Sequence, residues 1–502
     1  MRAFAATFRW QVAQALLAGA LLPLAYSPID FWPLQIVSLA WLYLLMQQRT
    51  PSEAARLGFA YGVGAFGVGT SWVYVSIHDF GNAPPALAGV ITAGFVLLLA
   101  GYVALQFYLY RRYCTQRASA IVGFAATWVL GEWLRGWLFT GFPWLYLGYP
   151  HVTTFLSGIA PLFGVLGLTF VIALSSAFVG DLVLYATRRN TELRAHWLRT
   201  FVALIALWSV SFALRDIAWT SPKDAPPLSV GLVQGNVEQN LKFDPAHLQD
   251  GLNRYASLSS TLWENDLVVW PETAIPLVYQ REPDLIAQLN AQASANNATL
   301  ISGVFFQTPD AVHNSLATFG DGSGVWHKQK LVPFGEYVPL RNVLSTLLQL
   351  FALPQSSLQP GPDDQMLLAA GPHQIAAFIC YEVVYPDFVR YYGRDADLLL
   401  TVSNDTWFGA SWGPHQHLQM ATMRARELGR HMVRATNNGI SALIDERGAI
   451  TATVPQFTAT VLQGEVRLFE GSTPFARWGS WPVLLLSIAV LMAAALRNRT
   501  PR

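Results

Sequence analysis

The chain has 502 residues, of which 53% are hydrophobic and 13% charged, and its formal net charge is +1. A typical soluble protein has roughly 25% charged residues, so this balance indicates a membrane protein. The charge near zero gives no support for nucleic-acid binding, 18 Trp and 29 Phe exclude general disorder, and two cysteines are too few for a disulfide framework.

The long apolar runs lie in residues 1–220 and in a last segment, 477–497. A helix that crosses a bilayer core needs roughly 20 mostly apolar residues. We therefore expect a polytopic α-helical membrane domain of about eight transmembrane helices, about seven in the first region and one at the C-terminal end. The expected spans lie near 9–25, 31–47, 57–77, 86–109, 119–139, 158–186, 200–219 and 477–496. The first two are short enough to form one helical hairpin, and we interpret the first as a retained helix rather than a cleavable signal peptide.

The arginines predict an orientation for these spans. Lys and Arg that flank a span are retained on the cytoplasmic side of the membrane. Arginines gather near residues 2–9, 49–56, 111–117, 188–199 and 497–502, whereas the connections 78–85 and 140–157 contain no Lys or Arg. Both termini are then cytoplasmic, and the segment before the last span lies outside. In a bacterium, this arrangement would be that of a multi-pass protein of the inner (cytoplasmic) membrane with this segment in the periplasm.

The segment 226–470 is less apolar and long enough to bury its own core. Short runs rich in branched and aromatic residues alternate there with helical patterns, of which 415–430 is the clearest. This alternation predicts an α/β domain with a largely buried sheet, joined to the membrane part by a linker at 221–227. The predicted strands are 229–234, 267–271, 300–306, 315–319, 374–380, 397–403 and 431–436.

Three segments of this domain carry a side chain that could react. Glu272 follows one predicted strand, Lys328 lies in a short polar stretch, and Cys380 closes another strand. Each alone has an ordinary explanation: Glu and Lys usually face solvent, and a single Cys on an apolar strand is more often part of the core than a nucleophile.

Together the three side chains supply the parts of an acyl-transferring site. A thiol nucleophile needs a base that takes its proton and a donor that stabilises the oxyanion. Glu272 can act as the base, whereas Lys328 can favour the thiolate and stabilise the oxyanion. The combination favours covalent catalysis on Cys380 over three unrelated structural roles.

In this order, Glu272, Lys328 and Cys380 resemble the Glu-Lys-Cys catalytic triad of the nitrilase superfamily, whose domain is an αββα sandwich. With the flanking membrane spans, the chain resembles the apolipoprotein N-acyltransferase family over nearly its whole length. The motifs that carry the resemblance are Leu232–Asn236, Trp270–Thr273, Leu331–Tyr337, Ile379–Glu382, Ser403–Gly409 and Arg434–Gly439, with Glu132–Arg135 and Thr140–Trp144 in the membrane part.

The resemblance implies an enzyme that transfers an acyl chain from a membrane phospholipid to the α-amine of the N-terminal diacylglyceryl-cysteine of an apolipoprotein, the last step of bacterial lipoprotein maturation. It implies a ping-pong mechanism with a thioester on Cys380. Glu336, Tyr381 and Glu382 match residues that support the family's site. Glu336 is the candidate for a second carboxylate beside Lys328 or Glu272, and a surface Glu in a Pro-Gly turn is the alternative.

Lipid contacts are predicted from apolar stretches outside the spans. Trp144 belongs to an aromatic loop at the predicted outer interface, where Trp and Tyr are favoured. Phe351 lies in the apolar stretch 343–353, which we expect to dip into the bilayer beside the site rather than form an ordinary buried helix. Phe243 stands where members of the family carry Trp, and it is the third candidate for lipid binding.

Two charged residues, Glu132 and Arg135, fall one helical turn apart in or near a predicted span. Charges at membrane depth are costly and are usually paired or functional. We expect a mutual ion pair that orients the loop after it.

Other classes of site have less support. His415, His417 and His431 do not form a metal-ligand pattern, and no phosphate-binding glycine loop is present, so we expect neither a metal nor a cofactor. The expected partners are the phospholipid donor, the diacylglyceryl lipoprotein acceptor and the bilayer, with a monomeric enzyme. A membrane-tethered amidase that resolves the thioester with water is the main alternative, and a transporter is disfavoured because no paired halves with broken helices are evident.

Overall fold

The computed structural model describes residues 2–114, 117–188, 194–333, 335–337 and 358–498. The chain divides into two compact units. The first unit comprises Met1–Tyr74, Pro84–Ile217 and Trp478–Arg502, and the second comprises Val75–Ala83 and Ala218–Arg477. Each unit has its own set of packed elements.

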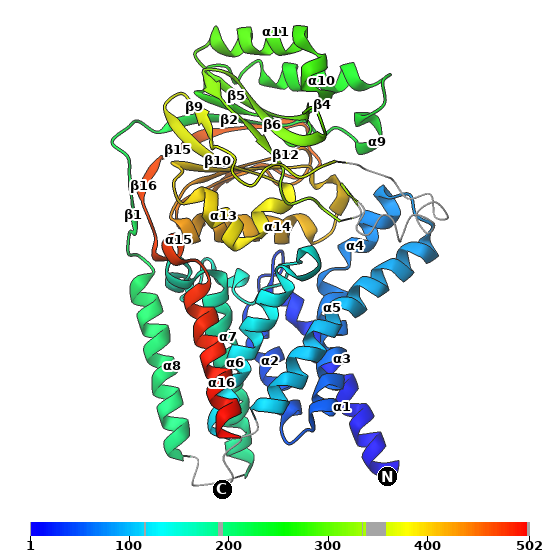
Figure 1. Cartoon of the computed structure of the whole chain (residues 1–502), viewed down its shortest axis with the longest axis vertical. Coiled ribbons are helices and arrows are strands. Elements are labelled where there is room, and N and C mark those ends of the chain that lie inside the picture. Colours follow the sequence, from blue (N-terminus) through cyan, green and yellow to red (C-terminus); the bar gives the residue numbers. More distant parts are fainter. Residues whose placement is uncertain (1, 115–116, 189–193, 334, 338–357, 499–502) are drawn as a thin grey trace. The chain divides into compact units, whose positions relative to one another are not determined.

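The first unit is helical throughout its described length (Figure 1). Helix α3 packs against α1 and α5, and helix α6 packs against α7 and α16. The main helices are α1 (Arg2–Leu21), α2 (Pro33–Met46), α3 (Pro51–Gly69), α5 (Pro85–Tyr113), α6 (Arg117–Arg135), α7 (Ala160–Arg188), α8 (Arg194–Leu214) and α16 (Trp481–Arg497).

Three described helices are long and apolar enough to cross a membrane, namely Pro85–Tyr113, Ser157–Ala186 and Trp197–Leu214. Two further apolar helices, α2 and α16, are shorter. This finding supports a membrane protein. By length and composition, three of the described helices qualify as spans, so the predicted number of eight is not shown.

One predicted span has different ends in the structure. The span expected at 57–77 begins earlier, because Thr50 and Glu53 form a reciprocal N-terminal cap and Pro51 occupies the first turn. It also ends earlier, at Gly69, where the Thr70 hydroxyl donates to the Phe66 carbonyl at 2.7 Å. A short helix, α4 (Trp72–Val75), follows the break.

Glu132 and Arg135 each bind the loop that follows α6. The Glu132 carboxylate accepts hydrogen bonds from Trp128 Nε1 (3.0 Å) and the Leu147 amide (2.9 Å). The Arg135 guanidinium donates to the carbonyls of Phe142 and Trp144. The prediction of a mutual ion pair was wrong, because the carboxylate bonds Trp128, Thr169 and the Leu147 amide, whereas the guanidinium bonds loop carbonyls. Both side chains nevertheless contact the following loop, as predicted.

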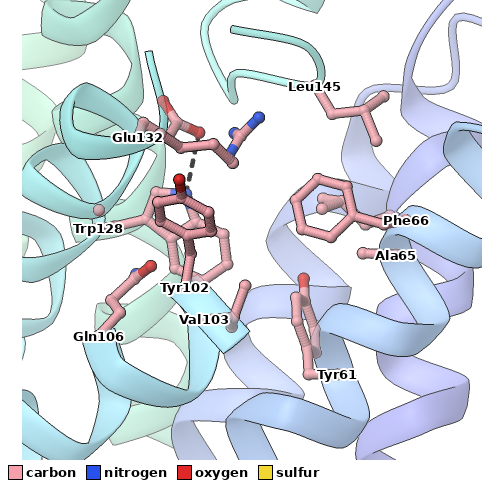
Figure 2. A pocket seen from close by; sticks show the side chains of 12 residues that line it. Tyr61, Ala65, Phe66, Tyr102, Val103, Gln106, Trp128, Glu132 and Leu145 are labelled. Atoms are coloured by element: carbon pink, nitrogen blue, oxygen red, sulfur yellow. Dashed lines mark hydrogen bonds between the residues drawn. The ribbon is translucent and has the colours of Figure 1, made fainter. Parts of the chain in front are cut away.

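A small cavity lies inside this unit beside Glu132, and Figure 2 shows that Tyr61, Phe66, Tyr102 and Gln106 contribute side chains to its lining. Trp144, predicted as a lipid contact, is fully buried and stacks on Phe142 with ring centroids 5.7 Å apart. In this structure Trp144 therefore packs the interior of the unit, and its contact with lipid stays a prediction.

The second unit contains two mixed sheets among the described residues, packed face to face. The first has the order β15-β2-β3-β5-β6-β8, with β4 (Ile275–Val278) beside β5. Its strands are β15 (Thr460–Val466), β2 (Leu228–Gln234), β3 (Leu267–Val269), β5 (Thr299–Gln307), β6 (Val312–Gly320) and β8 (Val325–His327). The second has the order β14-β13-β12-β11-β10-β9-β7. Its strands are β14 (Ile450–Thr453), β13 (Ala442–Ile444), β12 (Met432–Thr436), β11 (Leu398–Ser403), β10 (His373–Ile379), β9 (Leu368–Ala370) and β7 (Gly322–Ser323).

Helices cover the outer faces of both sheets, so the unit is an αββα sandwich (Figure 1). Helices α10 (Leu248–Ser259) and α11 (Pro283–Ser294) cover the first sheet, and α13 (Pro386–Gly393) and α14 (Gly413–Leu428) cover the second. Every strand predicted from the sequence is present, and the helix predicted at 415–430 is α14. The α/β fold of this region is thus confirmed.

The direction of the strands determines where the site can form. Strands β2, β3 and β5 run parallel, and so do β10, β11 and β12. The carboxyl ends of parallel strands meet at one edge of a sheet, where side chains from the following loops converge. Glu272 follows β3, and Cys380 follows β10.

The short segment 75–83 belongs to this second unit. The Ser76 hydroxyl donates to the Trp407 carbonyl at 2.7 Å, and the ring of Phe80 lies 6.3 Å from that of Trp407. These contacts attach the segment to the loop after β11.

The first unit yields a packing prediction. A Cβ atom on Gly64 would lie 2.0 Å from the Leu16 carbonyl oxygen of α1, whereas a Cβ on Gly67 of the same helix meets nothing within 4 Å. Gly64→Leu should therefore separate α1 from α3 and lower the free energy of unfolding by roughly 3 kcal/mol. Gly67→Leu is the matched control, expected to change it by about 0.5 kcal/mol at most. Thermal unfolding of the detergent-solubilised chain measures both, and equal stability of the two variants would contradict the packing.

Candidate active site

Lys328 joins two carboxylates in a buried cluster of the second unit. Its Nζ lies 3.0 Å from Glu272 Oε1 and 2.9 Å from Glu336 Oε2. The Lys328 side chain is only 1% exposed. Of the residues predicted from the sequence, Glu272, Lys328 and Glu336 are thus brought together, and Glu336 pairs with Lys328 rather than facing solvent from a turn.

Two asparagines that the sequence analysis missed complete the surroundings of Glu272. Asn314, on β6, donates from Nδ2 to Glu272 Oε1 at 2.8 Å and to Glu336 Oε1 at 3.0 Å. Asn404 lies directly after β11, and its main-chain N–H donates to Glu272 Oε2 at 2.8 Å. Only the position of Asn404 at a strand end could have suggested its role, because Asn314 lies inside a strand.

Cys380 occupies a strained turn at the end of β10. Its φ is +53°, a left-handed conformation that non-glycine residues seldom adopt. Strained backbone conformations of this kind are frequent at functional sites. Its side chain is partly exposed. The Cys380 carbonyl lies 3.2 Å from Nε2 of His417, which holds the peptide from α14.

Glu382 and Tyr381 hold the same turn. The Glu382 carboxylate accepts hydrogen bonds from the amides of Ile379 (2.8 Å) and Gln329 (2.6 Å). It therefore ties the strand that ends at Cys380 to the residue after Lys328. Tyr381 is buried with its ring edge-on to Tyr385, 5.3 Å between centroids.

The surroundings shift the pKa values of Glu272 and Cys380 in opposite directions. Burial alone would raise the pKa of Glu272, but the Lys328 ammonium and the hydrogen bonds from Asn314 and Asn404 lower it below its usual value. Burial and the Glu272 carboxylate raise the pKa of the Cys380 thiol well above its usual value, with Lys328 acting against them. The resting site therefore has an ionised carboxylate and a neutral thiol.

Asp405, His417 and Arg434 form a second buried network behind the Cys380 turn. Arg434 Nη2 lies 2.7 Å from Asp405 Oδ2, and His417 Nδ1 lies 3.1 Å from Asp405 Oδ1. Although burial opposes its ionisation, the Arg434 guanidinium and His417 lower the pKa of Asp405 to about 2. This ion pair therefore supports the histidine that contacts the Cys380 carbonyl.

The remaining predicted residues lie in different surroundings. Phe243 is 52% exposed, and its ring lies 6.3 Å from that of Phe305. Phe351 and the stretch 343–353 lie outside the described residues. His431 bonds Glu446 at 3.2 Å, away from the network of His417.

The chain is similar to known proteins over nearly its whole length. Two family models match the chain: apolipoprotein N-acyltransferase N-terminal domain over residues 18–178, and carbon-nitrogen hydrolase over residues 229–471. The apolipoprotein N-acyltransferase of Azotobacter vinelandii is 47% identical over 97% of this chain and 95% of its own length. The chain belongs to the apolipoprotein N-acyltransferase family.

Further relatives extend the similarity. The apolipoprotein N-acyltransferase of Pseudomonas syringae pv. tomato is 44% identical over 97% of this chain and 96% of its own length. That of Coxiella burnetii is 38% identical over 96% of this chain and 99% of its own length. Among solved structures, a carbon-nitrogen hydrolase superfamily protein from Xanthomonas campestris aligns at 20% identity with a TM-score of 0.36, covering 55% of this chain and 99% of that chain. Membership of the apolipoprotein N-acyltransferase family identifies an acyltransferase of lipoprotein N-acylation whose second unit has the carbon-nitrogen hydrolase fold.

The Asp405–Arg434 pair gives a prediction for this acyltransferase. Asp405→Asn leaves the Arg434 guanidinium buried without its carboxylate, which should lower the free energy of unfolding by about 3–5 kcal/mol. The double variant Asp405→Asn/Arg434→Met is expected to be more stable than Asp405→Asn alone. Denaturation of the full chain measures both, and a double variant less stable than the single one would contradict the pairing.

The same pair predicts a pH dependence. The pKa of Asp405 is lowered in the folded state, so its stabilisation is present above its ordinary value of 3.8 and is lost as the pH falls through about 2. Between these values the unmodified chain should lose more stability than Asp405→Asn.

Proposed function

We propose that this chain transfers an acyl group from a membrane phospholipid to the α-amine of the N-terminal diacylglyceryl-cysteine of an apolipoprotein, the last step of lipoprotein maturation. The proposal places a thioester intermediate on Cys380, with Glu272 and Lys328 as its catalytic partners. The observation that carries it is the buried Lys328 ammonium between the Glu272 and Glu336 carboxylates, in the same unit as the strained Cys380 turn.

In the first half-reaction Glu272 takes the proton from the Cys380 thiol, and the sulfur attacks the ester carbonyl of the phospholipid. The carbonyl oxygen becomes an oxyanion, which the Lys328 ammonium stabilises. When the tetrahedral intermediate collapses, the C–O bond breaks and the lysophospholipid alkoxide leaves with the proton held by Glu272. The products are a lysophospholipid and an acyl thioester on Cys380.

In the second half-reaction the free α-amine of the lipoprotein attacks the thioester carbonyl. Glu272 accepts a proton from the amine, Lys328 stabilises the second oxyanion, and the C–S bond breaks. The Cys380 thiolate recovers its proton from Glu272, and the acyl chain remains on the amine as an amide. No net proton is gained or lost by the enzyme over the cycle.

The charge state of the site supports these roles. The pKa of Glu272 is lowered and that of Cys380 is raised, so the base begins ionised and the nucleophile begins protonated. Proton transfer from thiol to carboxylate is then unfavourable at rest. The Lys328 ammonium offsets this cost by stabilising the oxyanion that forms as the sulfur–carbon bond is made. The free thiolate therefore need not accumulate.

The lipid substrates explain why a membrane part accompanies the carbon-nitrogen hydrolase fold. Extracting an acyl chain into water costs about 0.8 kcal/mol per CH₂ group. Helices that hold the enzyme in the bilayer avoid this cost, because the tails stay in hydrocarbon. On the arginine distribution of its helix ends, we propose that the enzyme lies in the bacterial inner membrane with its second unit in the periplasm.

Intact-mass analysis after incubation with phospholipid tests the mechanism. We expect an acyl adduct that maps to Cys380 and is absent from Cys380→Ala. Glu272→Gln and Lys328→Met should slow its formation by roughly a hundredfold or more, because each removes a group that acts in the transition state.

Discharge of the adduct separates transfer from hydrolysis. A diacylated lipopeptide with a free α-amine should remove the acyl group and become N-acylated, whereas its N-acetylated form should not. Loss of the adduct to water at the same rate would instead support a membrane-tethered amidase. A folded chain that forms no adduct would rule out the covalent mechanism.

A further inference from the structure

Lys242 is a buried charge beside the site that the mechanism above does not use. It ends α9 (Gln239–Lys242) and is 3% exposed. Its Nζ donates to the main-chain carbonyl of Glu272 at 3.1 Å. An ammonium removed from water is costly unless it is well paired, so a buried lysine bonded to the catalytic segment calls for a role.

Lys242 and Glu272 also interact through their charges. Burial lowers the pKa of Lys242 to about 8, and the Glu272 carboxylate acts against that shift by favouring the ammonium. The interaction is mutual, so the ammonium favours the ionised form of Glu272. Near neutral pH Lys242 is charged and contributes a positive field at the base.

The charges of the site balance only when Lys242 is included. Glu272 and Glu336 are the carboxylates, and Lys328 and Lys242 are the ammonium groups, all buried or nearly so. Without Lys242, two carboxylates would face one ammonium, and the oxyanion would form at a site that already carries a net negative charge. Cys380 would make a negative site still less favourable for the reaction, since its thiol becomes an anion.

We propose that Lys242 is a positioning residue of the acyl-transfer site, which anchors the Glu272 main chain through its hydrogen bond and keeps the Glu272 carboxylate ionised through its positive charge. This inference rests on the proposed function of Glu272 as the base. Lys328 contacts the Glu272 carboxylate and joins it to Glu336, the charge of Glu272 acts on Cys380, and Lys242 bonds the Glu272 main chain from α9. Lys242 thus acts through Glu272 and does not touch the substrate.

A purely structural lysine would leave a different signature. The pKa of Lys242 is lowered in the folded state, so folding is opposed by its charge below pH 8 and this cost disappears as the pH rises from about 8 towards 10.5. Removing the charge should therefore not reduce stability at neutral pH. If Lys242 acted only in stability, its variants should unfold at a lower temperature. If it acts in catalysis, they should lose activity without losing stability.

The test compares Lys242→Met, which removes both the charge and the hydrogen bond, with Lys242→Gln, which keeps a donor and removes the charge. Lys330→Met is the matched control, because Lys330 is an exposed lysine near the same site. The full chain in phospholipid nanodiscs is sampled from pH 3 to pH 9, a range that includes the acid limb set by Glu272, and the rate of acyl-adduct formation on Cys380 is followed by intact mass. Thermal unfolding is measured on the same samples.

For both Lys242 variants we expect the acid limb of the rate profile to move to higher pH, because the positive charge is lost, with an unfolding temperature equal to or above that of the unmodified chain. Lys242→Met also removes the hydrogen bond that anchors Glu272, so its rate at pH 7 should fall about tenfold, whereas Lys242→Gln should retain most of that rate. Lys330→Met should retain the unmodified profile. An unchanged profile in both variants, or a rate loss that is equal at every pH and accompanied by a lower unfolding temperature, would overturn the inference. If the unmodified chain forms no adduct at any pH, it is the proposed function that fails, before any variant is compared.

Discussion

A lysine ammonium held out of water between two carboxylates is the interaction on which the site depends. Burying one charge costs several kcal/mol, and the attraction of its partners offsets that cost only when the geometry is good and the remaining hydrogen bonds are made. Lys328 meets these conditions with Glu272 at 3.0 Å and Glu336 at 2.9 Å. Asn314 donates a hydrogen bond to each carboxylate, which reduces the repulsion between the oxygen atoms of Glu272 and Glu336. Each member of the cluster is therefore fixed by the others, and the cluster is rigid before any substrate arrives.

The sandwich supplies that rigidity through the ends of its strands. Glu272 follows β3 in one sheet and Cys380 follows β10 in the other, so packing the two sheets face to face brings these two residues into one unit of structure. The positive φ of Cys380 costs about 1–3 kcal/mol and persists only where its surroundings enforce it. Glu382 enforces it from one side by accepting the amides of Ile379 and Gln329, and His417 does so from the other side at the Cys380 carbonyl. The hydrogen bonds of this buried network thus hold the Cys380 backbone in its strained conformation.

The sequence allowed much of this to be predicted, because the strands of the second unit are short apolar runs with clear ends. Residues that react are placed just after such runs, which is why Glu272 and Cys380 could be found from their positions. Asn314 and Lys242 could not, because their partners depend on strand pairing and on the path of α9, neither of which leaves a local pattern. In the membrane part the one-turn spacing of Glu132 and Arg135 suggested an ion pair. Instead, Arg135 bonds main-chain carbonyls of the following loop, and Glu132 bonds a loop amide and the side chains of Trp128 and Thr169.

Under the proposed function, the chemistry of two lipid substrates explains why one buried cluster is sufficient. A site that bound the phospholipid and the lipopeptide together would need room for both headgroups and all their acyl chains at once. In a ping-pong cycle the substrates arrive in turn, and the same carboxylate and ammonium serve an ester oxygen first and an amine afterwards. Each half-reaction generates an oxyanion at the same carbonyl carbon, so a fixed ammonium stabilises both without moving. Such a site requires the base to be ionised at the start of each half-reaction, and the positive charges that surround Glu272 favour that state.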